Sequence, residues 1–422
     1  MLKDILEKQG LPLALGLALA VRVFCVVASP PRALTGDALE YDAIGWNIAC
    51  GAGFSQDPGI PTPIRAPGYP FFLAAVYLVF GHSPYAAALV QALLGALCCL
   101  LVFDIAFSFF ARRTALLAAF LYAVYPVGAA YSGLILSETL FTALFLGSLA
   151  LFIRSGRGER PVLLALAAFL LGLATLTRPT TILFPAGFVI AMLPGWKRTL
   201  RGAVITAVFF SAALGPWTMR NYRSFGVFMP VATGGSVCLY ATGEQAAGLT
   251  RDYDFTGAIK ARTELVAGGW KSGEPEPNIA ADRKLKADGM RMIKDNLRGY
   301  FLLVLRRVPK YWFSSHSSVF GVDLPLGEYR ARGEYLPVVF RLSLIGLHFI
   351  LAALAAWGML VSLASFRTWS VLLLVLAYFS MHALFDMCPR YLVPVYPYVL
   401  IFCAAALTEL YGRFRPAPGE AE

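Results

Sequence analysis

Three carboxylates stand close together in a short stretch that follows the first long apolar run. The segment Thr35-Gly36-Asp37-Ala38-Leu39-Glu40-Tyr41-Asp42 places Asp37, Glu40 and Asp42 within six residues. In a protein that is 58% hydrophobic and 14% charged, carboxylates at a membrane edge are costly unless they are used. Each of them alone could equally be a solvated loop residue. The cluster as a whole favours acid–base chemistry.

Asp37 and Glu40 also have local alternatives. Asp37 follows Gly36, where a helix is expected to begin, so capping of the helix N-terminus is the alternative to catalysis. Glu40 lies on nearly the same helical face as Asp37, where it either orients Asp37 or is simply an exposed neighbour. Desolvation would raise the pKa of Asp37 and a nearby arginine would lower it. The sequence leaves open which effect is larger.

Several arginines stand where membrane topology disfavours them. Arg178, Arg220 and Arg390 fall at the expected outer ends of apolar runs, whereas Lys and Arg concentrate on the cytoplasmic side. Arginine binds phosphate through two parallel hydrogen bonds, so a phosphate-binding role is predicted for at least one of the three. For Arg390 the alternative is a structural ion pair with the preceding Asp386.

The composition indicates the elements that must position these residues. The chain has 422 residues and a mean hydropathy of +0.65, with apolar runs near the length of a membrane span throughout. This predicts an all-α polytopic membrane protein, because barrel strands would be short and alternating. The net charge of +11 does not indicate nucleic acid, since the basic residues punctuate the ends of apolar runs.

The placement of Lys and Arg predicts the topology. Lys3 and Lys8 put the N-terminus inside, and the first apolar run, from about Leu11 to Ala28, is interpreted as a retained anchor. The run from Tyr69 to Phe80 is too short to cross and is interpreted as a re-entrant or juxtamembrane helix. About ten transmembrane helices are expected. Further spans are expected at 85–110, 115–125, 204–214, 338–363, 371–385 and 391–407. Three additional spans, the fourth to the sixth, are expected to end near residues 154, 177 and 196.

The composition also divides the chain. Residues 1–220 are predicted to form the catalytic transmembrane core, with a first outer loop at 30–84. Residues 221–335 carry most of the soluble charge and are predicted to form a small extracytoplasmic domain with an interfacial helix at 300–313. Residues 336–422 are predicted to hold the last transmembrane helices and a cytoplasmic tail. The seven cysteines show no zinc or redox spacing, and whether any of them pair is open.

At this point a family resemblance emerges from motifs spread along the chain. They are Gly36-Asp37 with Tyr41, Gly53-Phe54, Arg65-Ala66-Pro67-Gly68-Tyr69-Pro70, Leu136-Ser137-Glu138-Thr139-Leu140-Phe141, Thr177-Arg178-Pro179, Pro216-Trp217 with Arg220-Asn221-Tyr222, and Arg390-Tyr391. In this order they resemble the GT-C membrane glycosyltransferases. The nearest branch contains glycosyltransferase family 39, the protein O-mannosyltransferases, and the lipid A aminoarabinose transferases.

The resemblance implies a fold and an activity. The expected architecture is the GT-C fold with outer juxtamembrane helices. The implied reaction moves a sugar, with inversion, from a polyprenyl-phosphate donor to an acceptor on the outer face. The implied location is the inner (plasma) membrane, with the active site facing the periplasm or exterior. The donor sugar is open, and so is the acceptor, which could be a protein, lipid A or another glycan or lipid.

The resemblance also assigns roles to residues. Asp37 matches the family's catalytic acidic position and is expected to take the proton from the acceptor hydroxyl. Glu138 matches a second acidic position that contacts sugar or acceptor, with helix capping as the alternative. The leaving phosphate departs as an anion, so cations matter more than a general acid. The catalytic candidates are therefore Asp37, Glu138 and Glu40, and the substrate-binding candidates are Arg65, Tyr41, Tyr69, Arg178, Arg220 and Arg390.

The sequence predicts no required cofactor and leaves two rival functions open. His82 and His316 show no metal-ligand spacing, so no required metal or cofactor is predicted, although a divalent metal is an open alternative. The partners expected are the lipid-linked donor, membrane lipids and the acceptor, with no nucleic acid. One rival is a transporter or flippase for lipid-linked sugars, for which Asp104 is the clearest intramembrane acid. The other is a non-catalytic envelope assembly factor of the same fold.

Overall fold

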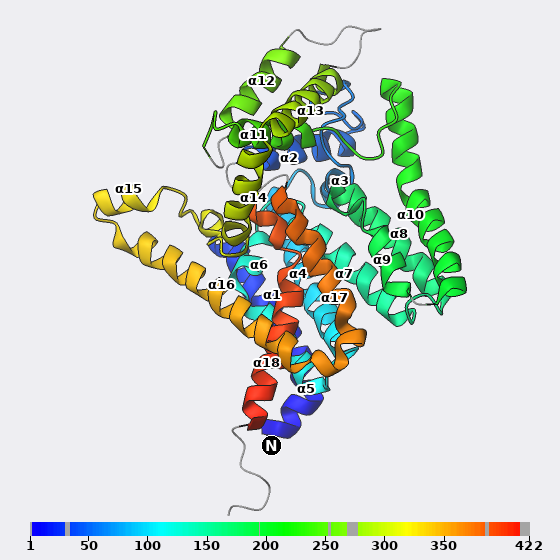
Figure 1. The fold of residues 1–422 in the computed structure, drawn as a ribbon, viewed down its shortest axis with the longest axis vertical. Coiled ribbons are helices and arrows are strands. Elements are labelled where there is room, and N and C mark those ends of the chain that lie inside the picture. The colour runs from blue at the N-terminus through cyan, green and yellow to red at the C-terminus, as the bar shows by residue number, and fades with distance from the viewer. Residues whose placement is uncertain are drawn as a thin grey trace, which may run out of the picture.

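The computed structural model describes residues 2–29, 34–193, 195–251, 255–267, 277–384 and 388–413, and these fold almost entirely into helices. The N-terminus of the chain lies at one end of the molecule and a group of three helices, α11, α12 and α13, lies at the other (Figure 1). We call these three helices the cap. The predicted alternative ion pair of Arg390 with Asp386 falls outside the described residues.

The central bundle is built from helices that follow one another in the sequence. Helix α1 (Leu2–Ala28) packs on α4 (Pro84–Phe107) and α5 (Arg112–Val124), and α7 (Glu138–Arg154) packs on α4 and α8 (Pro161–Thr177). Buried alanines on α1 and α4, such as Ala14, Ala18 and Ala92, let these backbones approach closely. Helix α18 (Tyr396–Arg413) returns from the far end of the chain to pack on α5 and on α16 (Tyr335–Val361).

Among the described residues, four helices are long and apolar enough to cross a membrane, namely Gln9–Ala28, Pro84–Phe107, Trp196–Phe225 and Tyr335–Val361. Shorter apolar helices accompany them at Gly68–Phe80, Pro161–Thr177, Pro179–Met192 and Trp369–Leu384. A polytopic all-α membrane protein is thus confirmed, while the number of about ten spans stays a prediction.

The remaining short elements are α6 (Pro126–Tyr131), η1 (Pro179–Thr181), α9 (Pro185–Met192), η2 (Ser317–Phe320), α15 (Leu326–Ala331), η3 (Leu363–Ser365), α17 (Phe366–Ser380), η4 (Met381–Leu384) and η5 (Pro389–Leu392).

Helix α10 extends beyond the predicted seventh span. That span was expected at about 204–214, and α10 (Trp196–Phe225) continues through Pro216 for a total of 30 residues. Proline removes one backbone hydrogen bond, and such a helix continues where its neighbours hold it in place. Here Trp217 Nε1 donates a hydrogen bond of 2.6 Å to the carbonyl of Val231, and Thr218 Oγ1 donates one of 3.0 Å to the carbonyl of Leu214.

The first outer loop forms two short helices that pack together. Helix α2 (Asp37–Ala49) lies against α3 (Gly68–Phe80), which matches the predicted juxtamembrane helix in its bounds. Both helices lie at the cap end of the molecule (Figure 1). The buried Asp42 carboxylate fixes this pair, because it accepts hydrogen bonds from Tyr77 Oη at 2.6 Å and from His82 Nε2 at 2.9 Å.

The cap consists of α11 (Gly235–Ala246), α12 (Thr256–Val266) and α13 (Pro277–Asp295), with α13 packing on both of the others. Helix α14 (Leu297–Trp312) then leads from the cap back toward the bundle (Figure 1). It corresponds to the helix predicted at 300–313 and is amphipathic. Phe301 is 63% exposed, whereas Arg307 is buried and donates a hydrogen bond of 3.1 Å to Thr242.

Candidate active site

The first predicted catalytic residue lies between two arginines. Asp37 is the first residue of α2, and its Oδ1 accepts a hydrogen bond of 2.5 Å from Arg65 Nη2. Its Oδ2 accepts a short hydrogen bond from Arg390 Nη2. The N-cap position belongs to Gly36, which has a φ of +55° that favours glycine, and no side chain caps this helix. The carboxylate of Asp37 is therefore used in ion pairs and not in capping.

Glu40 is connected to Asp37 through a shared arginine. Glu40 Oε2 accepts a hydrogen bond of 2.6 Å from Arg65 Nε, while the same guanidinium binds Asp37 through Nη2. The two acids stand one helical turn apart on α2, so a single arginine reaches both. Glu40 thus orients Arg65, and it acts on Asp37 through that residue.

The second predicted acid is held by two arginines as well. Glu138, at the start of α7, accepts a short hydrogen bond from Arg178 Nη1, and Arg390 Nε lies 3.6 Å from its Oε1. Arg390 therefore contacts both Asp37 and Glu138. The six residues alternate in sign, and we call them the ion-pair network: Glu40, Arg65, Asp37, Arg390, Glu138 and Arg178.

The ion-pair network is assembled from distant segments of the chain. Arg65 precedes α3, Arg178 follows α8, and Arg390 lies in η5, the turn that precedes α18. Gly68 brings the first two segments together, because a Cβ at this position would lie 2.5 Å from Thr177 Oγ1 and 2.9 Å from the backbone of Thr177. The start of α3 can approach the end of α8 this closely only with glycine.

The surrounding charges decide the protonation of Asp37. Burial raises the pKa of Asp37, but the charges and hydrogen bonds of Arg390 and Arg65 lower it by more, so its pKa falls below the usual range. The carboxylate of Asp37 is consequently ionised at neutral pH. Burial lowers the pKa of Arg65 while Glu40 and Asp37 raise it by more, and Arg65 therefore keeps its charge.

A polar cavity of 390 Å³ lies beside the ion-pair network and beneath the cap. Asp37, Arg65, Arg178 and Arg390 line its floor, together with Tyr41, Ser137, Thr177 and Tyr391. Its other wall includes Thr233 and Gly234, which precede α11, Gly235, which begins α11, and Arg262 of α12. The carboxylate of Asp37 and three guanidiniums of the ion-pair network are thus accessible from one space.

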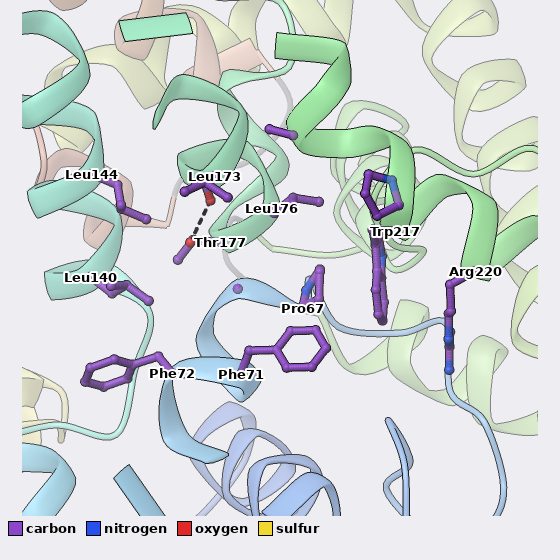
Figure 2. A pocket seen from close by; sticks show the side chains of 13 residues that line it. Pro67, Phe71, Phe72, Leu140, Leu144, Leu173, Leu176, Thr177, Trp217 and Arg220 are labelled. Atoms are coloured by element: carbon purple, nitrogen blue, oxygen red, sulfur yellow. Dashed lines mark hydrogen bonds between the residues drawn. The ribbon is translucent and has the colours of Figure 1, made fainter. Parts of the chain in front are cut away.

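An apolar groove of 630 Å³ adjoins the polar cavity. Figure 2 shows Phe71 and Phe72 of α3, Leu140 and Leu144 of α7, Leu173 and Leu176 of α8 and Trp217 of α10 around it. We call it the first groove. Thr177 lines both the first groove and the polar cavity, and Arg178 follows it directly in the cavity. The apolar groove and the charged cavity thus lie on either side of Thr177.

The predicted substrate-binding residues are not all in the cavity. Tyr41 lines it, and the Arg65 guanidinium lies 5.3 Å from the centre of the Tyr41 ring. Tyr69 is fully buried behind Tyr41 and donates a hydrogen bond of 2.8 Å to Gln91 of α4, so it lies outside the cavity. Tyr69 is buried because the face of α3 that carries it packs against the helical bundle.

Arg220 also lies apart from the ion-pair network. It lines the first groove, and its guanidinium donates hydrogen bonds to the carbonyls of Thr62, at 3.3 Å, and Phe54, at 3.2 Å. It also lies 4.8 Å from the centre of the Trp217 ring, beside which Figure 2 shows it. Among the described residues no carboxylate pairs with Arg220, so its positive charge is not neutralised at the groove.

Sequence reasoning missed several residues of the site. Ser137 accepts a hydrogen bond of 3.3 Å from Arg178, and Tyr391 lies under the Arg178 guanidinium at 4.8 Å. Both are direct neighbours of residues that were predicted, and this adjacency could have indicated them. Arg262 carried no signal in the sequence, because only the packing of the cap brings it to the cavity.

The possible metal ligands of the site are its carboxylates. In the described part of the chain, no group of three or more His, Cys, Asp and Glu side chains is arranged to hold a metal ion. Asp37, Glu40 and Glu138 each face at least one guanidinium. A divalent cation would have to displace these arginines to reach the carboxylate oxygens that it prefers.

Comparison with known proteins gives one family match. Residues 64–217 match the family described as dolichyl-phosphate-mannose-protein mannosyltransferase. The matched range includes Arg65, Glu138 and Arg178, and it leaves out Asp37 and Arg390. No curated protein matches the chain by sequence.

Solved structures are similar over nearly the whole chain. The oligosaccharyltransferase of Archaeoglobus fulgidus, tethered to an acceptor peptide containing the NVT sequon, is 13% identical with a TM-score of 0.56, covering 97% of this chain and 50% of that one. The same enzyme, AglB, in complex with an inhibitory peptide and a dolichol-phosphate, is 16% identical with a TM-score of 0.55, covering 97% and 51%. ArnT from Cupriavidus metallidurans in the apo state is 16% identical with a TM-score of 0.43, covering 94% and 76%.

The chain therefore spans about half the length of the archaeal oligosaccharyltransferase. The match shows that the chain has the GT-C fold, as the sequence resemblance predicted. Together with the family match, it supports a membrane glycosyltransferase in general, without the sugar, the donor lipid or the acceptor.

Proposed function

We propose that this GT-C membrane protein transfers a sugar, with inversion, from a polyprenyl-phosphate donor to an acceptor on the outer face of the membrane. One observation carries the proposal: an ionised carboxylate, Asp37, lines a polar cavity that shares the lining residue Thr177 with an apolar groove. The cavity suits the sugar and phosphate, and the groove suits an isoprenoid chain.

The boundary at Thr177 supports one pose of the donor in this proposal. The isoprenoid chain would lie in the first groove between Leu173 of α8 and Trp217 of α10, with the phosphate just beyond Thr177. There it would meet Arg178, whose guanidinium lines the cavity although the side chain is largely buried. Arginines placed at the leaving oxygen stabilise the negative charge that develops as the bond to the sugar breaks. This is the role we assign to Arg178 and Arg65.

Asp37 is placed to act as the base. It lines the polar cavity and also a second cavity of 320 Å³, formed with Leu34, Leu134 and Leu136. Inversion requires the acceptor oxygen to attack the anomeric carbon from the side opposite the leaving phosphate. A carboxylate that is reachable from two sides can accept the proton from the acceptor hydroxyl on one side while the donor occupies the other.

Glu138 and Glu40 receive a different role in this proposal. Glu138 is 1% exposed and lies behind the guanidiniums of Arg178 and Arg390, so it orients both arginines without touching the substrate. Glu40 orients Arg65 in the same way. They are positioning residues, and Asp37 alone is proposed as the catalytic carboxylate.

Helix α7 supports the proposed orientation in the membrane. This helix begins at Glu138 beside the polar cavity and ends at Arg154, which pairs with Asp104 of α4. Basic residues collect on the cytoplasmic side, so the cavity is assigned to the outer face of the inner (plasma) membrane. The transporter alternative requires charges near the bilayer midplane. Asp104, the clearest acid within a predicted span, was expected close to the inner end, and its ion pair with Arg154 gives it a structural role.

The experiment uses the full-length protein in lipid nanodiscs with a panel of radiolabelled polyprenyl-phosphate sugars. Release of free polyprenyl phosphate is measured for the native sequence and for Asp37→Asn. We expect release to fall by about a hundredfold or more in Asp37→Asn, since general bases contribute that much. Asp57→Asn, an exposed acid in the same loop, serves as the control. Equal release by Asp37→Asn would exclude Asp37 as the base, and absence of donor binding would favour the assembly-factor alternative.

A further inference from the structure

One charged side chain reaches the polar cavity from the cap. Arg262 of α12 lines the cavity, and its Nη2 donates a hydrogen bond of 3.1 Å to Oδ1 of Asn278 at the start of α13. Arg262 is partly buried. Among the described residues no carboxylate forms an ion pair with Arg262, and the amide of Asn278 carries no charge. The positive charge of Arg262 is therefore not balanced at this wall.

The other guanidiniums of the cavity are already paired. Arg65, Arg178 and Arg390 each contact at least one carboxylate of the ion-pair network. The network contains three acids and three arginines, so its formal charges cancel. Arg262 is the remaining charged residue among the described residues that line the cavity, and it gives the cavity one unbalanced positive charge.

Hydrogen bonds fix the cap relative to the floor of the cavity. The Thr233 N–H donates a hydrogen bond of 2.9 Å to the carbonyl of Pro63, in the loop before α3. Within the cap, Oδ1 of Asp282 in α13 accepts a hydrogen bond of 2.9 Å from the Gly234 N–H, which precedes α11. Helix α12 packs on both α11 and α13, beside which Figure 1 shows it. These contacts set the position of Arg262 at the cavity.

The placement of Arg262 indicates which part of a substrate it meets. In the proposed function, the donor phosphate lies just beyond Thr177 and beside Arg178, on the floor of the cavity. The acceptor reaches Asp37 from the second cavity of 320 Å³, and Arg262 is not among the residues that line that cavity. The cap side of the polar cavity is then left for the donor sugar.

A guanidinium at this wall selects a ligand by its charge. Arg262 has five N–H donors, of which one is directed to Asn278. A guanidinium matches a carboxylate through two parallel hydrogen bonds. The hydroxyl groups of a neutral sugar would accept hydrogen bonds there as well, but they would leave the charge of a partly buried group unbalanced. A carboxylate on the sugar supplies both the hydrogen bonds and the charge.

We propose that Arg262 determines the specificity for the donor sugar by binding the carboxylate of an acidic sugar, such as a uronic acid. The inference rests on the proposed function, in which the donor occupies the polar cavity. Arg262 contacts the sugar away from the bond that breaks. It therefore affects which donor is chosen and does not take the proton that passes to Asp37.

The first test measures binding without turnover. Full-length protein in nanodiscs is titrated with farnesyl-phosphate donors that carry glucuronic acid, glucose or glucosamine, and tryptophan fluorescence is followed. We expect the glucuronic acid donor to bind about tenfold or more tightly than the glucose donor, because hydrogen bonds between charged groups are the stronger ones. In Arg262→Gln this ratio should fall to about one. In Arg262→Glu the glucosamine donor should bind more tightly than the glucuronic acid donor, a reversal that misfolding cannot produce.

Lys260→Gln is the matched control. Lys260 also lies on α12, and its substitution removes the same charge. It is largely exposed, lies 4.0 Å from Glu264, and is not among the residues that line the cavity. Lys260→Gln should keep the native ratio of affinities. A fall as large as that in Arg262→Gln would indicate a general effect of charge on the cap and would overturn the inference.

The second test separates the sugar from the lipid linkage. Release of the polyprenyl lipid is measured with monophosphate donors of glucuronic acid and of glucose, and with a diphosphate donor of glucose. We expect Arg262→Gln to lower kcat/KM for the glucuronic acid donor, relative to the glucose monophosphate donor, by about tenfold or more. An equal fall for both monophosphate donors, or a fall confined to the diphosphate donor, would assign Arg262 to a phosphate and overturn the inference.

The outcomes separate this inference from the proposed function. Equal binding of the glucuronic acid and glucose donors by the native protein would overturn the inference. Release of polyprenyl phosphate from either monophosphate donor would still leave the proposed function in place. If no donor is bound or cleaved, the proposed function is refuted, and the role of Arg262 is refuted with it.

Discussion

Asp37 and Arg390 stand 353 positions apart in the sequence, and in the folded protein Arg390 Nη2 donates a hydrogen bond to Asp37 Oδ2. The contact joins the first outer loop to the turn that precedes α18. It also links the two acids of the site, because Arg390 reaches Glu138 from its Nε. The charge of Arg390 is one of the reasons why the pKa of Asp37 is lowered.

The pH dependence of transfer should change when Arg390 is replaced. In the native sequence the lowered pKa keeps Asp37 ionised, so kcat/KM should show no acid limb from this group between about pH 5 and pH 8. In Arg390→Gln, burial of Asp37 is opposed by Arg65 alone, the pKa rises, and kcat/KM should fall on the acid side. Arg390→Lys keeps the charge and should keep the flat profile.

The same shift predicts the sign of the effect on stability. A carboxyl whose pKa is lowered in the folded state stabilises that state above the pKa of the unfolded chain, about 3.9 for Asp. This stabilisation is lost as the pH falls through the lowered pKa of folded Asp37.

One outcome would contradict the prediction for kcat/KM. If kcat/KM of the native protein falls on the acid side and Arg390→Gln leaves that fall unchanged, a group other than Asp37 controls the rate.

Glu138→Gln should destabilise the protein strongly. Glu138 is 1% exposed, and the substitution leaves Arg178 and Arg390 without its charge. Breaking a buried ion pair by removing one partner costs about 3–5 kcal/mol. Thermal unfolding in detergent, followed by tryptophan fluorescence, measures the effect. Glu40→Gln is the control, because Glu40 is 27% exposed and such a pair contributes about 1 kcal/mol or less. Equal losses for both variants would contradict a buried role for Glu138.

Filling the first groove should affect long donors selectively. Leu173 lines this groove, so Leu173→Trp should raise the KM for long-chain polyprenyl-phosphate sugars by about tenfold, while donors with one or two isoprene units bind as before. Leu97→Trp, on an exposed apolar position of α4, controls for a bulky side chain facing lipid, since Leu97 is 47% exposed. An increase that is the same for short and long donors would place the isoprenoid chain elsewhere.

Chelation of divalent cations should have little effect. The carboxylates of Asp37, Glu40 and Glu138 are neutralised by guanidiniums, so the charge that would attract a dication is already balanced. Sugar transfer after dialysis against EDTA should stay within about twofold of the untreated rate, with Mg²⁺ and Mn²⁺ added back for comparison. A loss that is restored by one metal would show that an arginine moves aside and that a cation takes its place.

Local properties of the sequence determined the membrane character and many of the elements. The apolar runs predicted the helices of the bundle because the length of a span and the exclusion of charge can be read from consecutive residues. The short helix at 69–80 was predicted from an apolar run too short to cross, and the helix at 300–313 from its mixture of apolar, aromatic and basic residues. They correspond to α3 and α14. The predicted seventh span covers only part of α10, which continues as a helix to Phe225 because tertiary contacts such as that of Trp217 with Val231 hold it beyond Pro216.

For the site, the sequence indicated which charged residues lie at the outer edge of the membrane, where charge is uncommon. It did not indicate which of these residues form ion pairs with one another. Asp37, Arg65, Arg178 and Arg390 could be selected individually, because acids and outer arginines are rare in such a chain. Tertiary structure decided that these residues form one ion-pair network with Glu40 and Glu138, that Tyr69 and Arg220 lie outside the polar cavity, and that Arg262 lies on its wall. Ion pairs between segments hundreds of residues apart depend on how helices pack, and a single sequence holds no local signal for that.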